Sequence, residues 1–217
     1  MNGKVLNRNK AAPLHSGKLP KKPKRYSRPV PGDRVQLDTC KIGKGLYQFT
    51  AVDDCTRMRV LGLYDARTAK NAVQFLVEQM LVEFPFLIQR VQTDRGTEFV
   101  GFEFQDALRE RSIKFRPNRP AAPHLNGKVE RSQRTDRMEF WSTVDCSKDR
   151  EGLCHQLKEW QRFYNEERDH SSLSGKPPTK RLKEVEDQIP TKEAVQANYD
   201  PKKEMYQTSS KYSWQPA

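Results

Sequence analysis

The chain has 217 residues, of which 35% are hydrophobic, which is enough for one domain with extensions and a core confined to part of the sequence. No apolar run of about 18 residues and no apolar leader occur in it, so we expect neither a membrane span nor secretion, and a cytoplasmic location. The four cysteines have no CxxC spacing and do not cluster with the four histidines, which argues against a zinc site and against a disulfide framework. The net charge of +12 indicates a polyanionic partner.

The positive charge is concentrated at the N-terminus. Residues 1–30 hold nine Lys or Arg and no acid, so the rest of the chain holds 31 basic and 28 acidic residues. The same stretch is rich in proline, which predicts an extended basic arm. Two interpretations stay open, a solvated linker or an arm that binds phosphates. In the second, the binding cations are Lys21, Lys22, Lys24 and Arg25.

Three strands are predicted at the start of the folded part. In RVQLDTC, which begins at Arg34, apolar and polar residues alternate with the period of two that is typical of a strand. Two more strands, over 47–54 and 57–64, follow connections short enough for hairpins. A helix over 69–84 comes next, because apolar residues recur there at intervals of three and four until Pro85 ends it.

Strands and helices alternate in the second half of this domain. The predicted elements are, in order, strand 87–93, helix 103–111, strand 113–117, proline-rich loop 117–127 and a poorly apolar helix 127–141. Three consecutive strands followed by this alternation predict an α/β fold, with a mixed five-stranded sheet flanked by helices, over residues 31–145.

The C-terminal part is predicted to hold one long helix, over about 149–167. Its apolar side chains fall on one face, which we expect to pack on the sheet domain: Leu153, Leu157, Trp160 and Tyr164. Residues 146–183 are therefore assigned to a C-terminal segment packed on the core. Residues 184–217 are assigned to a polar tail without a role.

Three acids stand out by their positions. Asp38 lies within the first strand, Asp94 ends the fourth, and Glu130 lies early in the poorly apolar helix. Such positions can converge at one edge of a mixed sheet. Carboxylates packed together repel one another unless cations neutralise them, and oxygen ligands suit Mg²⁺ or Mn²⁺. By spacing alone the choice stays open, because other acids lie nearby: Asp53, Asp54, Asp65 and Glu98.

Cations surround the third acid. Residues 109–137 hold nine basic residues and three acidic ones. Arg134 and Arg137 follow Glu130 by four and seven positions, so they share its face of the helix. One interpretation is a solvated, salt-bridged face. The other is a helix that positions a phosphodiester beside a metal-binding acid.

Four blocks of sequence resemble the catalytic core of DDE transposases and retroviral integrases, particularly bacterial insertion-sequence transposases. The blocks are VQLDTC, VQTDRGTEF, PHLNGKVER and WQRFYNEERDHSSLSGKPP, and the resemblance covers residues 32–181. It implies a ribonuclease H-like fold in which Asp38, Asp94 and Glu130 bind two Mg²⁺ or Mn²⁺ ions. The last block matches the family's ending through Tyr164, Asn165, Arg168, His170, Leu173 and Pro177.

The resemblance also implies a function, namely metal-dependent cleavage and strand transfer of DNA at the ends of a mobile element, in a bacterial cytoplasm. The expected DNA-binding residues of this core are Asn126, Lys128, Arg131, Arg134 and Arg137. Joining two DNA ends implies a homodimer or a higher oligomer. Helix-turn-helix modules usually precede such a core, whereas here only the basic arm does, so three alternatives stay open: the modules lie on a separate chain that acts as recognition partner, were removed, or have been lost.

Two alternatives from other classes remain. The first is a non-catalytic DNA-binding protein that keeps the fold and the basic arm. The second is a ribonuclease H-like nuclease that cleaves RNA–DNA hybrids. The PHLNGKVER block and its basic helix favour the transposase.

Overall fold

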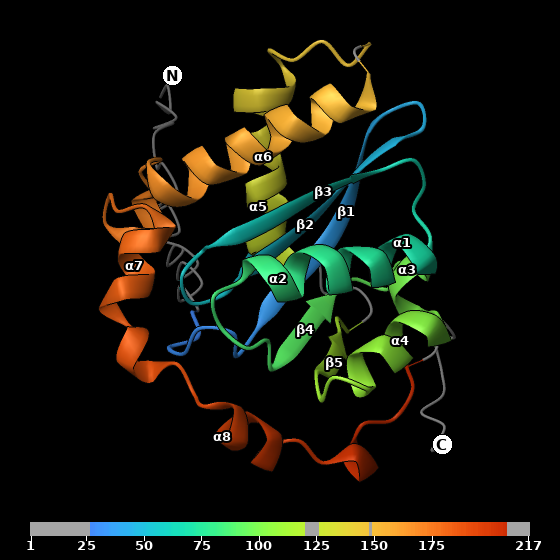
Figure 1. Ribbon diagram of the computed structural model, residues 1–217, viewed down its shortest axis with the longest axis vertical. Coiled ribbons are helices and arrows are strands. Elements are labelled where there is room, and N and C mark those ends of the chain that lie inside the picture. Colours follow the sequence, from blue (N-terminus) through green and yellow to red (C-terminus); the bar gives the residue numbers. More distant parts are fainter. Residues whose placement is uncertain (1–26, 120–125, 148, 208–217) are drawn as a thin grey trace, which may run out of the picture.

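The computed structural model describes residues 27–119, 126–147 and 149–207. Five strands form one sheet in the order β3-β2-β1-β4-β5 (Figure 1). The first three strands pair antiparallel, whereas β4 and β5 run parallel to β1. The predicted α/β fold with a mixed five-stranded sheet is therefore confirmed. The strands are β1 (Val35–Gly43), β2 (Leu46–Asp53), β3 (Arg59–Tyr64), β4 (Arg90–Thr93) and β5 (Lys114–Pro117).

One face of the sheet packs against the helices in front of it in Figure 1. The predicted helix 69–84 is continuous, with a π-helical turn η1 (Phe75–Met80) between α1 (Ala69–Gln74) and α2 (Leu81–Glu83). Beyond β4 come α3 (Thr97–Val100), which was not predicted, and α4 (Phe102–Arg109). The core on this side is built largely from buried aromatic and aliphatic side chains, including Leu37, Phe49, Phe75, Phe99 and Phe104.

The opposite face carries the other two long helices. They are α5 (Gly127–Asp136), continued by a π-helical turn η3 (Arg137–Trp141), and α6 (Arg150–Glu166). In Figure 1, α5 passes behind the sheet, and α6 lies alongside β3, which it contacts. The predicted packing of α6 is confirmed, because its apolar face joins strand and helix side chains in a second core: Leu61, Leu63, Phe140, Leu153, Leu157, Trp160 and Tyr164.

The chain after α6 folds back along the domain in short helices. These are η4 (Ser171–Leu173), α7 (Pro178–Glu184), η5 (Glu186–Gln188), α8 (Lys192–Ala197) and η6 (Pro201–Lys203). The sequence indicated only a polar tail from residue 184, yet Val185 and Val195 are buried and Glu204 bonds Arg116 at 2.5 and 2.6 Å. Apolar residues in this segment are too few to show a period, so its contacts were not predicted.

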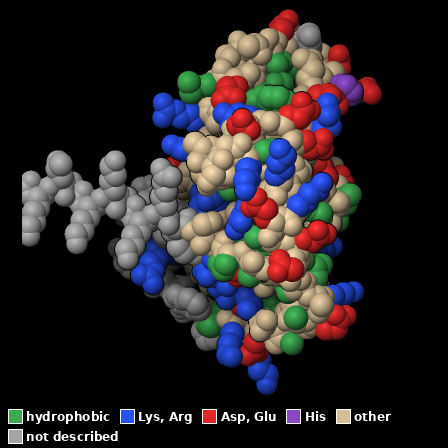
Figure 2. All heavy atoms as spheres, turned by 90° about the vertical axis from the view of Figure 1, so that its left-hand side faces the viewer, with side chains coloured by type: hydrophobic (Ala, Val, Ile, Leu, Met, Phe, Trp, Pro, Cys, Tyr) green, Lys and Arg blue, Asp and Glu red, His purple; other side chains and the backbone are tan. Residues whose placement is uncertain are grey.

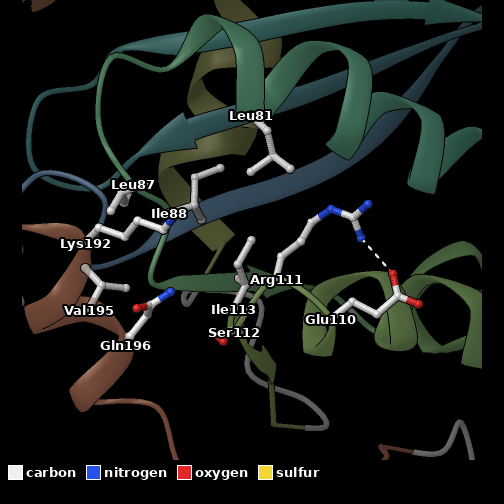
Figure 3. A pocket seen from close by; sticks show the side chains of 10 residues that line it. All are labelled: Leu81, Leu87, Ile88, Glu110, Arg111, Ser112, Ile113, Lys192, Val195 and Gln196. Carbon is white, nitrogen blue, oxygen red and sulfur yellow. Dashed lines mark hydrogen bonds and ion pairs between the residues drawn. The ribbon is translucent and has the colours of Figure 1, made fainter.

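A cavity of about 350 Å³ lies where α8 meets the core. Lys192, Val195 and Gln196 of α8 line one side of it, facing Leu87 and Ile88 (Figure 3). None of the acids singled out in the sequence lines this cavity. Within the described ranges, every helix is too short or too polar to cross a membrane.

Candidate active site

Asp38 and Asp94 are neighbours because of the register between two parallel strands. The pairing of β1 with β4 places Leu37 beside Thr93, so the next residue of each segment is an aspartate. Leu37 and Thr93 are fully buried. Side chains alternate along a strand, so both carboxylates leave the sheet on the opposite face, where α5 lies.

A glutamine on β1 fixes the start of α5. The Oε1 atom of Gln36 accepts hydrogen bonds from the backbone N–H groups of Lys128 and Val129, at 3.2 and 3.3 Å. A helix leaves its first N–H groups without internal partners, so this one side chain satisfies two of them. Val129 is fully buried, and Glu130 follows it directly. The helix therefore presents Glu130 next to the strand that carries Asp38.

The pKa of Asp38 shows that Asp94 and Glu130 lie near it. Burial raises the pKa of Asp38 to about 7, and the negative charges of Asp94 and Glu130 raise it as well. The backbone N–H of Thr39, 2.8 Å from Oδ1, acts in the opposite direction, as does the Gln133 amide. Asp38 is therefore destabilised as an anion by its burial and by two neighbouring carboxylates, which is the electrostatic situation that a bound cation relieves.

Asp94 is exposed and held by its own turn. Its Oδ1 atom accepts a hydrogen bond from the backbone N–H of Gly96 at 2.9 Å. This bond keeps the carboxylate at the end of β4 while the chain turns into α3. The glycine also has a packing reason, because a Cβ at position 96 would lie 2.6 Å from the carboxylate of Glu98.

The donor set fits a hard divalent cation. All three side chains offer carboxylate oxygens, which are the ligands that Mg²⁺ and Mn²⁺ prefer. No group of three His, Cys, Asp or Glu side chains in the described ranges is gathered as a finished metal site. Asp94 and Glu130 thus each lie within electrostatic reach of Asp38, without the three side chains being gathered around a common point. Their role as ligands stays a prediction.

Two of the alternative acids have structural partners in a loop. Asp53 is buried and accepts hydrogen bonds from the backbone N–H and hydroxyl of Thr56, both at 2.7 Å. Asp54 is also buried, forms an ion pair with Lys128 and accepts a hydrogen bond from Gln36 Nε2 at 3.3 Å. Both acids stabilise the turn after β2 and the start of α5.

The other two alternative acids, Glu98 and Asp65, also have structural partners. Glu98 is buried, accepts a hydrogen bond from the Thr39 hydroxyl at 2.6 Å and lies 3.5 Å from Arg67 Nε. It therefore ties α3 to β1. Asp65 accepts a hydrogen bond from Asn71 Nδ2 at 3.2 Å, next to the start of α1.

The predicted cations of α5 divide into two groups. Arg131, Arg134 and Arg137 are exposed. Arg137 lies beside Cys40 of β1, since its charge opposes the burial that raises the pKa of that thiol to about 12. Lys128 instead directs its ammonium group to Asp54, so it already serves as a structural partner.

The remaining predicted DNA contacts are one buried asparagine and the cations of the N-terminal arm. Asn126 is buried at the N-cap position directly before α5. Lys21, Lys22, Lys24 and Arg25 lie outside the described residues, as does the stretch 120–125 of the proline-rich loop.

A buried ion pair that sequence analysis missed holds α5 to the sheet. Arg59 of β3 places Nη1 2.5 Å from Oδ1 of Asp136, and both side chains are essentially unexposed. The indole N–H of Trp160 donates to the same Oδ1 at 2.7 Å, and Gln48 Nε2 donates to Oδ2 at 2.7 Å. Two charged residues 77 positions apart give no local pattern, so the sequence carried no signal for this pair.

Residues of the last sequence block, WQRFYNEERDHSSLSGKPP, contact Arg59 of this ion pair. The Tyr164 ring centroid lies 3.3 Å from the guanidinium carbon of Arg59. The Asn165 side chain accepts from the Arg59 backbone N–H at 3.0 Å and donates to its carbonyl at 2.8 Å. Arg168 makes two hydrogen bonds to Glu139, at 2.6 and 2.7 Å, just beyond α5. The block thus clamps the helix that carries Glu130.

Comparison with known proteins identifies the domain. Two family models, each described as an integrase core domain, match residues 28–123 and 111–178. The chain belongs to the integrase core domain family. The two matches together span every acid and every α5 cation discussed above.

Solved integrase cores share the fold of this integrase core. The BIV integrase catalytic core domain is 18% identical, with 72% of this chain and 97% of that one covered, at a TM-score of 0.57. The HTLV-2 integrase catalytic core domain in complex with magnesium, in its trimeric form, is 17% identical, with 70% and 96% covered, also at 0.57. The simian T-cell lymphotropic virus intasome in complex with PP2A regulatory subunit B56 gamma contains a chain 17% identical, with 76% and 59% covered, at 0.60. The fold is therefore the ribonuclease H-like fold of integrase cores.

One curated relative matches the integrase core in sequence. It is the "Putative integrase ORF3" of Spiroplasma virus SpV1-C74, which is 25% identical over 153 residues. The match covers 63% of this chain and 42% of that protein. The chain thus spans less than half the length of this relative.

Proposed function

We propose that this chain is the catalytic domain of a DNA transposase or integrase, which cleaves phosphodiesters at the ends of a mobile element and joins them to target DNA. One observation carries the proposal. Asp38 of β1 and Asp94, directly after the adjacent parallel strand β4, each follow a residue of the pair Leu37–Thr93, and Gln36 docks the helix that presents Glu130 against β1. The integrase names of the relatives support the same assignment.

Asp38, Asp94 and Glu130 would hold two Mg²⁺ or Mn²⁺ ions. When bound, such ions activate an attacking oxygen and stabilise the leaving one in a displacement at phosphorus. The residues of the chain supply the rest. The exposed Arg131, Arg134 and Arg137 place backbone phosphates along α5 beside the carboxylates, and the buried contacts of α5 keep Glu130 at a fixed distance from the sheet.

The partners follow from the same proposal. DNA binds along α5, and cleavage of two ends requires a homodimer or a higher oligomer. Solved HTLV-2 integrase cores are described in trimeric and dimeric forms, and another similar chain belongs to an intasome. We assign the recognition of particular ends to a helix-turn-helix module, which a separate chain could supply, in a bacterial cytoplasm, while the cations of residues 1–30 add contacts that do not depend on sequence.

The test is nicking of supercoiled plasmid DNA with Mn²⁺. The wild type should nick, whereas Glu130→Gln and Asp94→Asn should not, although both should still bind DNA. Two exposed acids away from the site serve as matched controls, so Glu103→Gln and Asp187→Asn should nick like the wild type.

Full nicking activity of Glu130→Gln would show that Glu130 is not a catalytic carboxylate and would overturn the proposed active site. DNA binding without nicking by the wild type, with either metal and at any concentration, would favour the non-catalytic binding protein. Cleavage confined to the RNA strand of an RNA–DNA hybrid would instead favour the nuclease.

A further inference from the structure

A row of cations crosses the sheet on the face that carries the candidate active site. The register places Val35 beside Val91, so Arg34, directly before β1, lies beside Arg90. Arg90 in turn pairs with Lys114 of β5. We call Arg34, Arg90 and Lys114 the cation row. They mark the starts of three parallel strands that lie about 4.8 Å apart.

The cation row and the carboxylates share one face. Arg34 precedes Asp38 by four residues, and Arg90 precedes Asp94 by four. An even separation along a strand keeps two side chains on the same face. Four residues of strand measure about 13 Å. One strand of a DNA duplex rises about 3.4 Å per nucleotide, so the gap equals roughly four nucleotides.

Positive charge near the row exceeds the negative charge. Asp33 is shared by two arginines, Arg28 at 3.2 Å and Arg90 at 3.4 Å. Burial lowers the pKa of Arg90, and the charges of Arg28, Arg34 and Arg116 lower it as well, which shows that these cations lie within reach of one another. Among the charges that act on Arg90, Asp33 is the one acid, and it raises the pKa of Arg90. A polyanion would relieve the repulsion.

The row is partly exposed, and the C-terminal segment reaches the edge of this surface at β5, where Glu204 binds Arg116. On this face α5 packs mainly on β1 and β2, and α6 on β3, so β4 and β5 lie beyond the main contacts of both helices. Arg90, Lys114 and Arg116 all retain exposed area. Figure 2 shows Lys and Arg side chains spread over the face that it draws, several of them towards its lower left.

The basic N-terminal segment joins the described chain next to this surface. The Ser27 hydroxyl donates to the carbonyl of Asp54 at 2.9 Å, and the backbone N–H of Arg28 donates to the Asp54 carboxylate at 3.2 Å. Arg28 is also the partner of Asp33. The 26 residues that precede Ser27 contain eight Lys or Arg and no acid. The cations of residues 1–26 are therefore followed directly in the sequence by Arg28 and by Arg34 of the cation row.

We propose that Arg34, Arg90 and Lys114 form a phosphate-binding row that holds the DNA backbone about four nucleotides from the bond that is cleaved. The placement relative to that bond rests on the proposed function, whereas the binding of phosphate by the row does not. Guanidinium groups suit this task, because their donors match a phosphate in a bidentate geometry.

The experiment measures binding of the full chain to a labelled DNA duplex over a range of salt concentrations, without divalent metal. Each cation that sits on a phosphate contributes about 0.9 to the slope of log K against log salt. Lys114→Gln and Arg90→Gln should each lower the slope by about that amount. The matched control is Lys70→Gln, an exposed lysine on α1 across the sheet, which should leave the slope unchanged.

A second variant acts in the opposite direction. Asp33→Asn removes the acid that two arginines share, so DNA binding should become tighter by severalfold at low salt. A thermal unfolding midpoint equal to that of the wild type shows that the tighter binding comes from the change of charge and not from a damaged protein. Equal slopes for Lys114→Gln and Lys70→Gln, with no gain from Asp33→Asn, would overturn the proposal.

The plasmid assay keeps this proposal apart from the proposed function. If the wild type does not nick but Lys114→Gln lowers the salt slope, the row stands and the catalytic assignment fails. If the wild type nicks and the slope does not move, the catalytic assignment stands and the row is wrong.

Discussion

Arg59 and Asp136 form an ion pair that joins the sheet to the helix carrying Glu130, with 2.5 Å between Nη1 and Oδ1 and no more than 1% of either side chain exposed. Charges buried in this way are held in place by their partners, because each is very costly to leave alone. The pair explains why aromatic and amide residues of the last sequence block lie so near the site. They surround Arg59 and close it off from water.

Breaking this pair should be strongly destabilising. We expect Asp136→Asn to lower the free energy of unfolding by about 3–5 kcal/mol, because the Arg59 charge then remains buried without a counter-charge. Replacing both residues, as Arg59→Met with Asp136→Leu, should recover most of that loss. Urea unfolding measures each value. The idea fails if Asp136→Asn is as mild as Arg162→Met, which changes an exposed arginine of α6.

Gln36 should act on activity through Glu130. Replacing it by leucine leaves two N–H groups at the start of α5 without their acceptor, which should cost about 1–3 kcal/mol of stability. The loosened helix should also lower the nicking rate per folded molecule, at a temperature where wild type and variant are both folded. Gln74→Leu on the exposed side of α1 is the control. A variant that loses stability but keeps its rate would show that Gln36 is structural only.

His170 should make the protein sensitive to acid. Its side chain is buried next to the Tyr164 ring, burial lowers its pKa to about 4, and nearby arginines lower it as well. The unfolded chain takes up a proton near pH 6.5, whereas the folded chain does so near pH 4. The stabilisation from neutral His170 is thus complete above pH 6.5 and is lost as the pH falls towards 4, by roughly 3 kcal/mol.

The measurement compares the wild type with His170→Gln from pH 7.5 to 4.5. The raised pKa values of Asp38 and Asp53 act in the opposite direction, but they are present in both proteins and cancel in the difference. The free energy of unfolding of the wild type, relative to that of the variant, should therefore decrease as the pH is lowered. His155→Gln, at an exposed histidine of α6, should show no such trend. A constant difference for His170→Gln would contradict the prediction.

Local patterns in the sequence determined most of the scaffold. The alternation in β1, the apolar stripe over 69–84 and the apolar face of α6 each repeat over a few residues, so the backbone geometry of one element can be read from them. The positions of Asp38, Asp94 and Glu130 within their elements followed in the same way. The order of strands and helices then indicated the mixed sheet, because hairpins and crossovers have different lengths.

Only the tertiary structure decided which distant residues meet. The register that sets Leu37 beside Thr93 also aligns Arg34 with Arg90, and a shift of one residue would have turned these side chains to the core. Contacts such as Arg59 with Asp136 depend on strand order and on how helices pack across the sheet. Such pairings join elements far apart in the chain, and the free energy of each depends on burial that no short stretch of sequence contains.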